Sequence, residues 1–217
     1  MKKLCIVMLM SVFTLMAGNG FSQKLVSGSF GDLKGQTTIN VQFDYANLII
    51  GDAASPFATN KGITEKEYVT KKTNELNAKK TGDGDRWAQA WVDDRAKLFH
   101  PTFITELNDK LEKSGLVAKE NAPDSKYTLI VKTVFIDAGF NVGISKKDAH
   151  INLLLDVVET AAPSKITASV DMKNIYKKSS WTVDGVSFDF AVGQRLQGCY
   201  EQAGISFGKF LAKGISK

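Results

Sequence analysis

Three apolar runs in the middle of the chain decide the fold: YTLIVKTVFID at 127–137, INLLLDVVE at 151–159 and KITASVDMK at 165–173. In the third run apolar and polar residues alternate, which is the two-residue period of a strand with one buried face. The first two runs are apolar on both faces, as inner strands are. Because the links between the runs are short, neighbouring strands are expected to be antiparallel. The sequence therefore predicts an antiparallel trio at the centre of a sheet.

Two other segments have the alternation of strands. Residues 38–45 place Ile39, Val41 and Phe43 on one side and polar residues between them. A later segment does the same with Val186, Phe188, Phe190 and Val192. With the central trio, these segments predict a sheet of about five strands. The first of them is expected to reach the trio through a long helical crossover.

Helical patterns fill the space between the strands. Thr64 and Glu67 have the spacing of a capping box, so a helix is expected over residues 65–79. Further helices are expected over residues 87–99 and 103–111, and an apolar stripe over residues 194–215 predicts a long terminal helix. Strands separated by helical blocks indicate an α+β fold. We predict a two-layer sandwich in which helices pack on a mixed, mostly antiparallel sheet.

The first 22 residues have the three-part pattern of a secretory signal peptide. Lys2 and Lys3 precede an uncharged apolar run at 4–17, and small or polar residues follow. Cleavage is expected after Ser22, which leaves 23–217 as one α+β domain. Cys5 lies at the start of the apolar run, where it cannot serve as the acylated cysteine of a lipoprotein. These features predict an exported protein, in the periplasm, without a transmembrane segment in the mature chain.

Composition narrows the classes of partner and chemistry. Without the two lysines of the leader, 26 basic residues face 23 acidic ones, a net charge of +3. Lysines and glutamates are interleaved over residues 65–80, which favours a solvated helix face over a nucleic-acid surface. Cys199 is the only cysteine left after cleavage, so no intramolecular disulfide forms. Its apolar helical surroundings predict burial in the core.

The order of elements resembles small modules of bacterial envelope machinery. The relevant stretches are a helix ending in Lys-Ser-Gly115-Leu, the run KYTLIV at 126–131, the strand NLLLDVVE at 152–159 and a terminal amphipathic helix. They look like the N-terminal domain of the Tol-system translocation protein and like the curli-secretion lipoprotein. The likeness covers residues 38–48 and 99–217. It implies a binding or assembly part without catalysis.

One motif points to an enzyme. Gly204-Ile-Ser206-Phe-Gly208 matches the nucleophile-elbow pattern GxSxG, which requires a strand-to-helix turn followed by an acid and a histidine. Here Ser206 lies within a helical stripe, and both His100 and His150 precede it. Glycines at contacts between helix and sheet explain the spacing better. A serine hydrolase using Ser206 is kept as an alternative function.

Metal and cofactor chemistry has little support in the sequence. His100 precedes Pro101 at a helix junction and His150 precedes a strand. Neither has a second histidine or a cysteine at ligand spacing, so no zinc site is expected. No glycine fingerprint for a phosphate or dinucleotide occurs, and we expect no cofactor.

Two pairs of side chains invite a structural interpretation. Trp87 and Trp91 are four residues apart on one helix face, either as a platform for a ligand or as an anchor of the helix against the domain, and the anchor is favoured. Lys132 and Asp156 are polar residues in the two most apolar strands. If the hairpin centres near Ile144, they lie opposite each other, and we predict a cross-strand ion pair.

The best candidate for a partner-binding site is the link between the first two central strands. It carries Phe140, Val142 and Ile144 where hairpin tips are normally polar, followed by Lys146 and Lys147. Exposed apolar groups in a loop often mark contacts, although these could equally extend the strands into the core. We predict an exported, non-catalytic module that binds another envelope protein. A carrier of a small apolar ligand, held between helices and sheet, is a further alternative.

Overall fold

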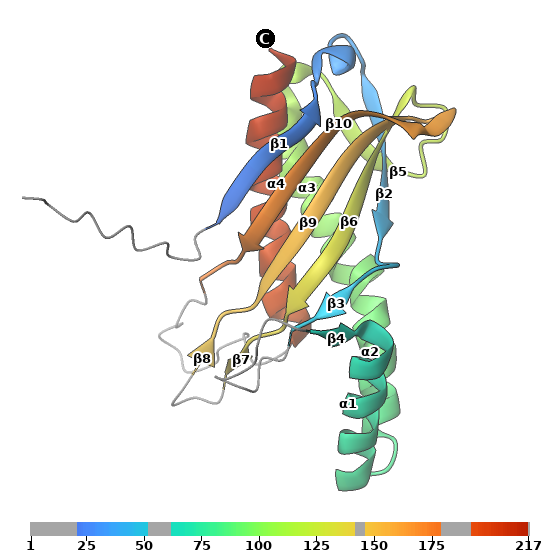
Figure 1. The fold of residues 1–217 in the computed structure, drawn as a ribbon, viewed down its shortest axis with the longest axis vertical. Coiled ribbons are helices and arrows are strands. Elements are labelled where there is room, and N and C mark those ends of the chain that lie inside the picture. The colour runs from blue at the N-terminus through green and yellow to red at the C-terminus, as the bar shows by residue number, and fades with distance from the viewer. Residues whose placement is uncertain (1–20, 52–61, 142–145, 179–191, 217) are drawn as a thin grey trace, which may run out of the picture.

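A computed structural model describes residues 21–51, 62–141, 146–178 and 192–216. They form two layers, a large twisted sheet and a pair of long helices on one of its faces (Figure 1). The strands are β1 (Ser22–Gly28), β2 (Thr38–Asp44), β3 (Ile49–Ile50), β4 (Ile63–Thr64), β5 (Val117–Glu120), β6 (Tyr127–Asp137), β7 (Phe140–Asn141), β8 (Lys146–Lys147), β9 (His150–Glu159) and β10 (Ala162–Ile175). The helices are α1 (Glu65–Lys79), α2 (Asp83–Asp94), α3 (His100–Leu111) and α4 (Val192–Ile215). The α+β prediction is confirmed.

The described sheet has eight strands, with the order β1-β10-β9-β6-β2-β5 and with β3 beside β6 and β4 beside β3. The central trio β6, β9 and β10 is antiparallel, as predicted, while β2 joins β6 and β5 in parallel. The prediction of about five strands was too low. It missed β1 because six of its seven residues are exposed and none is buried, so no alternation marks it. It also missed β3, β4 and β5, which have two to four residues each.

The first three helices begin and end near the expected residues. Thr64 and Glu67 form the capping box at the start of α1. α2 continues without a break into a π-helical segment, η2 (Arg95–Phe99), and then into α3. Pro101 sits in the first turn of α3, and Gly115 has the left-handed conformation (φ 72°) after a 3-10 turn. The sequence did not indicate that α2 and α3 form one continuous helical rod.

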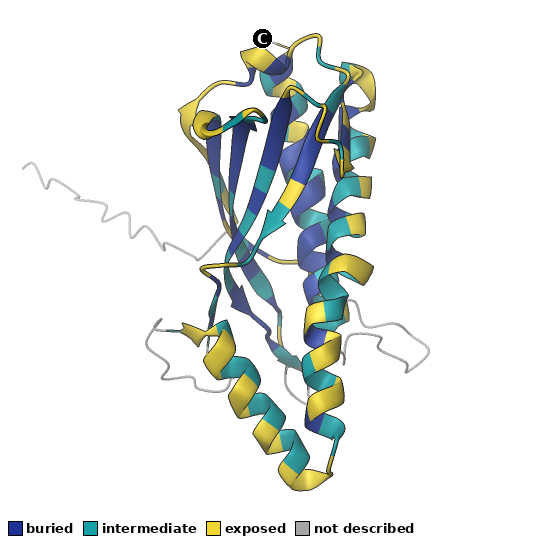
Figure 2. Ribbon diagram, turned by 90° about the vertical axis from the view of Figure 1, so that its right-hand side faces the viewer, coloured by how far each residue is buried: buried dark blue, intermediate teal, exposed yellow. Residues whose placement is uncertain are grey.

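The α1–α2 hairpin extends beyond the lower end of the sheet (Figure 1), and no residue of α1 is fully buried (Figure 2). An aromatic cluster of Tyr68, Trp87 and Trp91 holds the two helices together, with ring centroids 5.3–5.8 Å apart. Trp91 is buried, and its indole Nε1 donates to Glu65. The two tryptophans therefore anchor α2, as predicted, and they do so through Tyr68 of α1 and the buried core.

The terminal helix α4 packs on α3 and on the sheet. The predicted stripe is fully buried and comprises Leu196, Tyr200, Ala203, Phe207 and Leu211. Cys199 is buried as well, as expected, and its Sγ lies 3.3 Å from the carbonyl oxygen of Ala149. The predicted strand ending at Val192 falls almost wholly outside the described residues. Val192 itself is the first residue of α4, so the alternation does not continue to that position.

Candidate functional site

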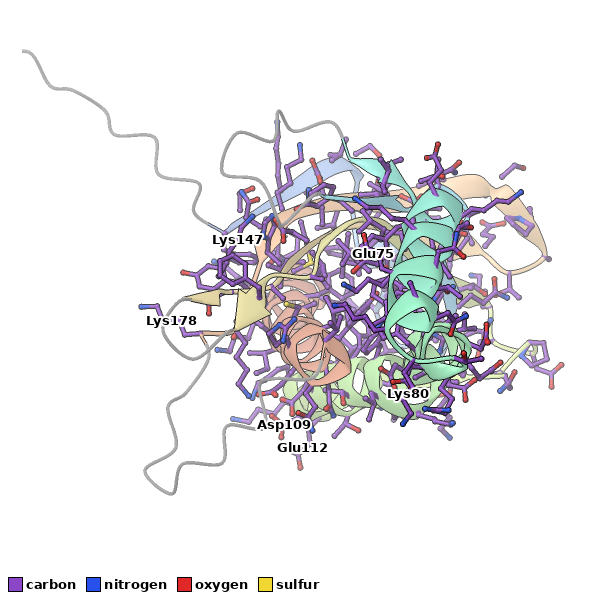
Figure 3. The ribbon with its side chains drawn as sticks, turned by 90° about the horizontal axis from the view of Figure 1, so that it is seen from below. Glu75, Lys80, Asp109, Glu112, Lys147 and Lys178 are labelled. Carbon is purple, nitrogen blue, oxygen red and sulfur yellow. The ribbon has the colours of Figure 1, made fainter. Side chains whose placement is uncertain are left out.

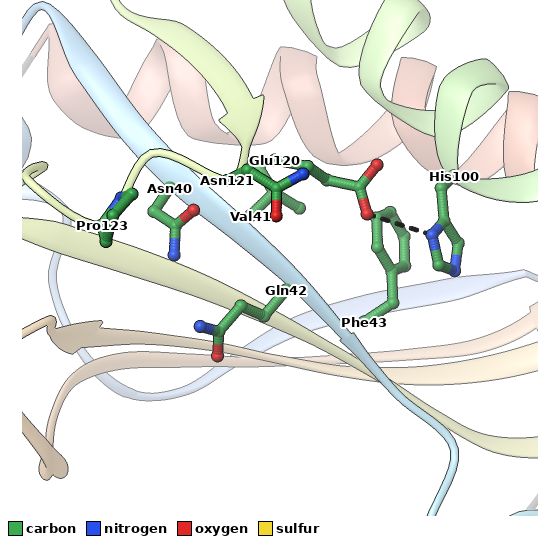
Figure 4. A pocket seen from close by; sticks show the side chains of 8 residues that line it. All are labelled: Asn40, Val41, Gln42, Phe43, His100, Glu120, Asn121 and Pro123. Carbon is green, nitrogen blue, oxygen red and sulfur yellow. Dashed lines mark hydrogen bonds and ion pairs between the residues drawn. The ribbon is translucent and has the colours of Figure 1, made fainter. Parts of the chain in front are cut away.

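A cavity of about 560 Å³ opens where β5 leaves the sheet (Figure 4). It is lined by Asn40, Val41, Gln42, Phe43, His100, Glu120, Asn121 and Pro123. β5 pairs with β2 only from Thr38 to Val41, and the chain turns away at Asn121, which has a left-handed φ of 56°. Because β2 continues to Asp44, its last residues border the cavity on the side where β5 has ended.

His100, at the start of α3, is the most connected group in this cavity. Its ring stacks on Phe43 with a centroid distance of 3.8 Å. Its Nδ1 lies 3.1 Å from a carboxylate oxygen of Glu120, and its Nε2 lies 3.3 Å from the hydroxyl of Tyr45. Figure 4 shows the contact between His100 and Glu120 as a dashed line.

The chain of hydrogen bonds continues into the core. The hydroxyl of Tyr200 donates to that of Tyr45 at 3.3 Å and also meets the hydroxyl of Thr133 at 2.6 Å. A single arrangement satisfies all of these groups: Thr133 donates to Tyr200, Tyr200 to Tyr45, and Tyr45 to His100 Nε2. The imidazole then carries its proton on Nδ1 and donates it to Glu120.

The protonation equilibria favour this neutral arrangement. Burial lowers the pKa of His100, and the Glu120 carboxylate offsets only part of that effect. Burial raises the pKa of Tyr45 to about 12, although the guanidinium of Arg95 lies over its ring at 4.0 Å. A phenol that holds its proton so firmly is a poor base or nucleophile at neutral pH. The network therefore positions side chains and does not supply an activated group.

Few polar groups of the cavity remain for a ligand. The side chain of Asn40 is already engaged, because its Nδ2 donates to Thr128 and its Oδ1 accepts from the backbone of Ala122. Gln42 and Asn121 are exposed at the rim. The cavity can hold a small neutral polar group by hydrogen bonds. Sequence reasoning weighed His100 as a metal ligand and as a partner of Ser206, and its contact with Tyr45, 55 positions away, left no local signal.

Ser206 has none of the surroundings that a nucleophile elbow needs. It lies in the interior of α4, and its hydroxyl accepts a hydrogen bond from Gln202 at 3.0 Å. A Cβ on Gly204 would lie 2.5 Å from the carbonyl oxygen of Phe103, and one on Gly208 would lie 2.7 Å from Lys110 Cβ. These glycines allow α4 to approach α3 closely. The expected contact with the sheet was wrong, since the partner is a helix.

The predicted partner-binding link is only partly described. Phe140 is half-buried in β7, and Lys146 and Lys147 form β8 opposite it. Lys147 is exposed, and its Nζ pairs with Asp137 at 2.6 Å. Val142 and Ile144 lie outside the described residues. The docking role of this link stays a prediction.

The predicted ion pair in the sheet is present. Lys132 Nζ lies 2.7 Å from Asp156 Oδ2, and the buried carboxylate also accepts from the hydroxyl of Ser169 at 2.6 Å. The predicted register was wrong by two residues, because Asp156 stands directly opposite Ile130. The pair is therefore diagonal, which the long lysine side chain spans.

Charges of both signs surround the lower end of the molecule. Figure 3 shows Glu75 and Lys80 on the α1–α2 hairpin, with Lys147 and Lys178 on the other side of the view. Within α1, Lys72 pairs with Glu75 at 3.6 Å. Charges of both signs are therefore interleaved here, as the sequence indicated, and the absence of nucleic-acid binding stays a prediction. Among the described residues, no group of histidine, cysteine and acidic side chains is arranged to hold a metal ion.

The two edges of the large sheet differ. At the β5 edge, the side chain of Asn108 pairs with the backbone of Ala118: Nδ2 donates to the carbonyl oxygen at 2.9 Å, and Oδ1 accepts from the N–H at 2.8 Å. The amide thus takes the place of a further strand. At the β1 edge no described residue forms hydrogen bonds to the outer side of the strand. Here Leu25 is 36% and Val26 57% exposed.

The described residues define an α+β protein with a helix pair on one face of a mixed sheet and with one open sheet edge. No protein-family model and no curated protein matches the chain. No helix among the described residues combines the length and the apolarity needed to cross a bilayer.

Solved structures with a similar fold include three bacterial proteins. The PelC dodecamer from Paraburkholderia phytofirmans is 8% identical, with 82% of this chain and 97% of that chain covered and a TM-score of 0.31. A DUF330 protein from Xanthomonas campestris is 13% identical (82% and 86% covered, TM-score 0.37). A putative neuraminyllactose-binding hemagglutinin homolog from Helicobacter pylori is 11% identical (84% and 89%, TM-score 0.34). Likeness at this level assigns no function. None of the three is a Tol or curli protein, so that resemblance stays a prediction.

Proposed function

We propose that the protein is an exported, non-catalytic binding or assembly module of the bacterial cell envelope, and that it acts on another envelope protein. Residues 1–22 would be removed on export, and 23–217 would form one domain.

One observation carries the proposal: exposed large apolar side chains follow the β1 side of the sheet. In the mature chain they are Leu25 and Val26 on β1, with Ile166 on β10 and Tyr176 just after it. β1 pairs with residues 168–173 of β10, so Leu25 and Val26 lie on the edge strand itself, while Ile166 and Tyr176 lie before and after the paired stretch. Exposed apolar side chains on an open edge strand are typical of a protein-binding surface.

The internal polar groups support a role without catalysis. His100, Tyr45 and Tyr200 satisfy one another in a closed network, and Ser206 is bonded within its own helix. Neither arrangement brings a nucleophile, a base and an acid to one accessible point. The link after Phe140, with Val142, Ile144, Lys146 and Lys147, is retained as a second contact to the partner.

Photo-crosslinking in intact cells tests the binding role. A photoreactive residue in place of Val26 should give a discrete adduct with an envelope protein. The same residue in place of Val92, an equally exposed valine (52%) on α2, should not. A probe at the exposed Lys147 tests the second contact. Equal adducts from positions 26 and 92, or none from any position, would count against a binding module.

An esterase assay tests the lack of catalysis. The purified protein and Ser206→Ala should both leave a panel of p-nitrophenyl esters at the background rate, because Ser206 has no base. Ester hydrolysis by the wild-type protein that is lost in Ser206→Ala would support the alternative function, a serine hydrolase. Native mass spectrometry should show the mass of the mature chain alone, whereas a retained small molecule would favour the carrier.

A further inference from the structure

β1 has backbone hydrogen-bonding groups that no described residue uses. Successive residues of a strand direct their N–H and C=O groups to opposite sides, so about half of those in β1 point away from β10. β1 is the last strand on its side of the sheet. An unused row of donors and acceptors is the feature to which an extended chain can add as a further strand.

The pairing of β1 with β10 limits where such a strand can lie. Residues Ser22 to Leu25 pair without interruption with Lys173 to Val170, and the register shifts between Leu25 and Ser27. The shift leaves Val26 as an extra residue at a bulge. A regular outer ladder is therefore expected along Gln23 to Leu25, which remain after the expected cleavage, with the exposed side chain of Val26 at its end.

Charge indicates the chemistry of the added segment. Lys24 is exposed and forms no ion pair with a described residue. Its cross-strand neighbour Asp171 pairs instead with Lys173, at 2.8 Å. β1 contains no acidic residue. A carboxylate on the added strand, on the same face as Lys24, would complete a pair that the chain itself leaves open.

A second copy of this chain fits the edge less well. Two β1 strands side by side would bring two copies of Lys24 and no acid into one strand pair. Like charges on neighbouring strands destabilise the pairing. The charge pattern therefore favours a different polypeptide over self-association.

We infer that β1 receives an extended segment of a partner protein as an added strand, and that this segment carries apolar side chains and one carboxylate placed to meet Lys24. The inference rests on the proposed binding role and gives that role a site and a chemistry. Backbone hydrogen bonds hold the added strand on β1, and contacts with Lys24, Leu25 and Val26 determine which sequences bind.

Binding of designed peptides tests the inference. The probes are two fluorescein-labelled ten-residue peptides of alternating valine and threonine, one with a central glutamate and one with a central lysine. The glutamate peptide should bind about 3- to 10-fold more tightly by fluorescence anisotropy, as expected from exchanging an attractive for a repulsive cross-strand pair. Lys24→Glu should reverse the order. Lys119→Glu, at the edge closed by Asn108, is the matched control and should leave the order unchanged.

Two further measurements separate strand addition from other modes. A glutamate peptide methylated on alternate backbone nitrogens should bind at least ~10-fold more weakly, since it cannot form the ladder. Hydrogen exchange of the β1 amides at 24–25 should slow when the unmodified peptide is added. Equal binding of the methylated peptide, an order that Lys24→Glu does not reverse, or no saturable binding would overturn the inference.

The result also separates the inference from the broader proposal. If position 26 crosslinks to an envelope protein in cells and no peptide binds, strand addition is wrong and the binding role stands. If neither occurs, both are wrong. A dimer seen by light scattering and dissociated by Val26→Lys would assign the edge to a second copy, which contradicts the inference.

Discussion

The β5 edge and the β1 edge terminate the same sheet in opposite ways. β5 has four residues, and the Asn108 amide occupies the backbone groups of Ala118 on its outer side. β1 has seven residues and leaves its outer side to solvent among the described residues. Natural sheets close their edges because an open edge pairs with other chains. This contrast is the basis of our proposal that the longer, open edge is a surface for pairing.

The largest expected effect comes from removing the anchor of the closed edge. Leu116, directly before β5, is buried, so Leu116→Ala should lower the free energy of unfolding by about 2–5 kcal/mol. The same change at the partly exposed Leu25 should cost about 1 kcal/mol or less. Urea denaturation of the two variants measures both values. If both variants lost similar amounts of unfolding free energy, Leu25 would contribute to folding as much as Leu116 does. That result would contradict a role of β1 in binding a partner.

Two glycines make the next comparison, one beside each edge strand. Gly28 and Gly115 both have φ above 70°, a conformation that costs an alanine about 1–2 kcal/mol. A Cβ at Gly115 would meet nothing within 4 Å, whereas one at Gly28 would collide with the carbonyl of Thr167. Gly28→Ala should therefore lower the free energy of unfolding by about 3 kcal/mol, which is more than the effect expected for Gly115→Ala. The reverse order would mean that the end of β1 does not lie against β10.

Opening the closed edge should have a smaller cost. Asn108→Ala removes two hydrogen bonds from the buried Ala118, at about 0.5–1.5 kcal/mol each. It should also speed hydrogen exchange at that amide and promote self-association through β5. Asn47→Ala, at an exposed asparagine, serves as the control. Unchanged exchange at Ala118 would refute the closure of this edge by Asn108.

The smallest effect concerns pH at the end of β5. Burial lowers the pKa of His100, so the unfolded chain takes up a proton more readily than the folded protein. This contribution to stability is present above about pH 6.5 and is lost as the pH falls toward the lowered pKa. His100→Gln should shrink the loss of stability on acidification, as followed by urea midpoints. Burial lowers the pKa of His150 too, so His150→Gln should shrink the loss of stability in the same direction. If the urea midpoint of His100→Gln fell with pH as steeply as that of the wild-type protein, this expectation would be wrong.

The parts of the fold that the sequence predicted are those where burial imposes a period. β6, β9 and β10 lie near the expected residues, since the apolar face of each strand is covered by helices. The stripe of α4 and the capping box of α1 followed from helical spacing in the same way. Each of these signals is local and repeats over many residues.

The parts that escaped prediction depend on contacts between distant residues. β1 pairs with a strand almost 150 positions away, and its exposed side chains carry no alternation. The cavity near His100 joins Phe43, Glu120 and Asn121 from three segments. The pairing of Lys132 with Asp156 was predicted, but the register was not. The irregularity of the hairpin between Thr133 and Phe135 accounts for one residue of the two-residue error.

The π-helical segment Arg95–Phe99 has a consequence for how the hairpin could change over time. A π turn accommodates one more residue than an α turn, so it shifts the phase of the helix on either side of it. In α2 that phase points Trp91 toward α1, and in α3 it points Phe103 into the core. Deletion of a single residue here would rotate one half by roughly 100° relative to the other. The number of residues between α2 and α3 thus sets the direction in which the α1–α2 hairpin points. An insertion or deletion within η2 would change that direction and leave the sheet intact.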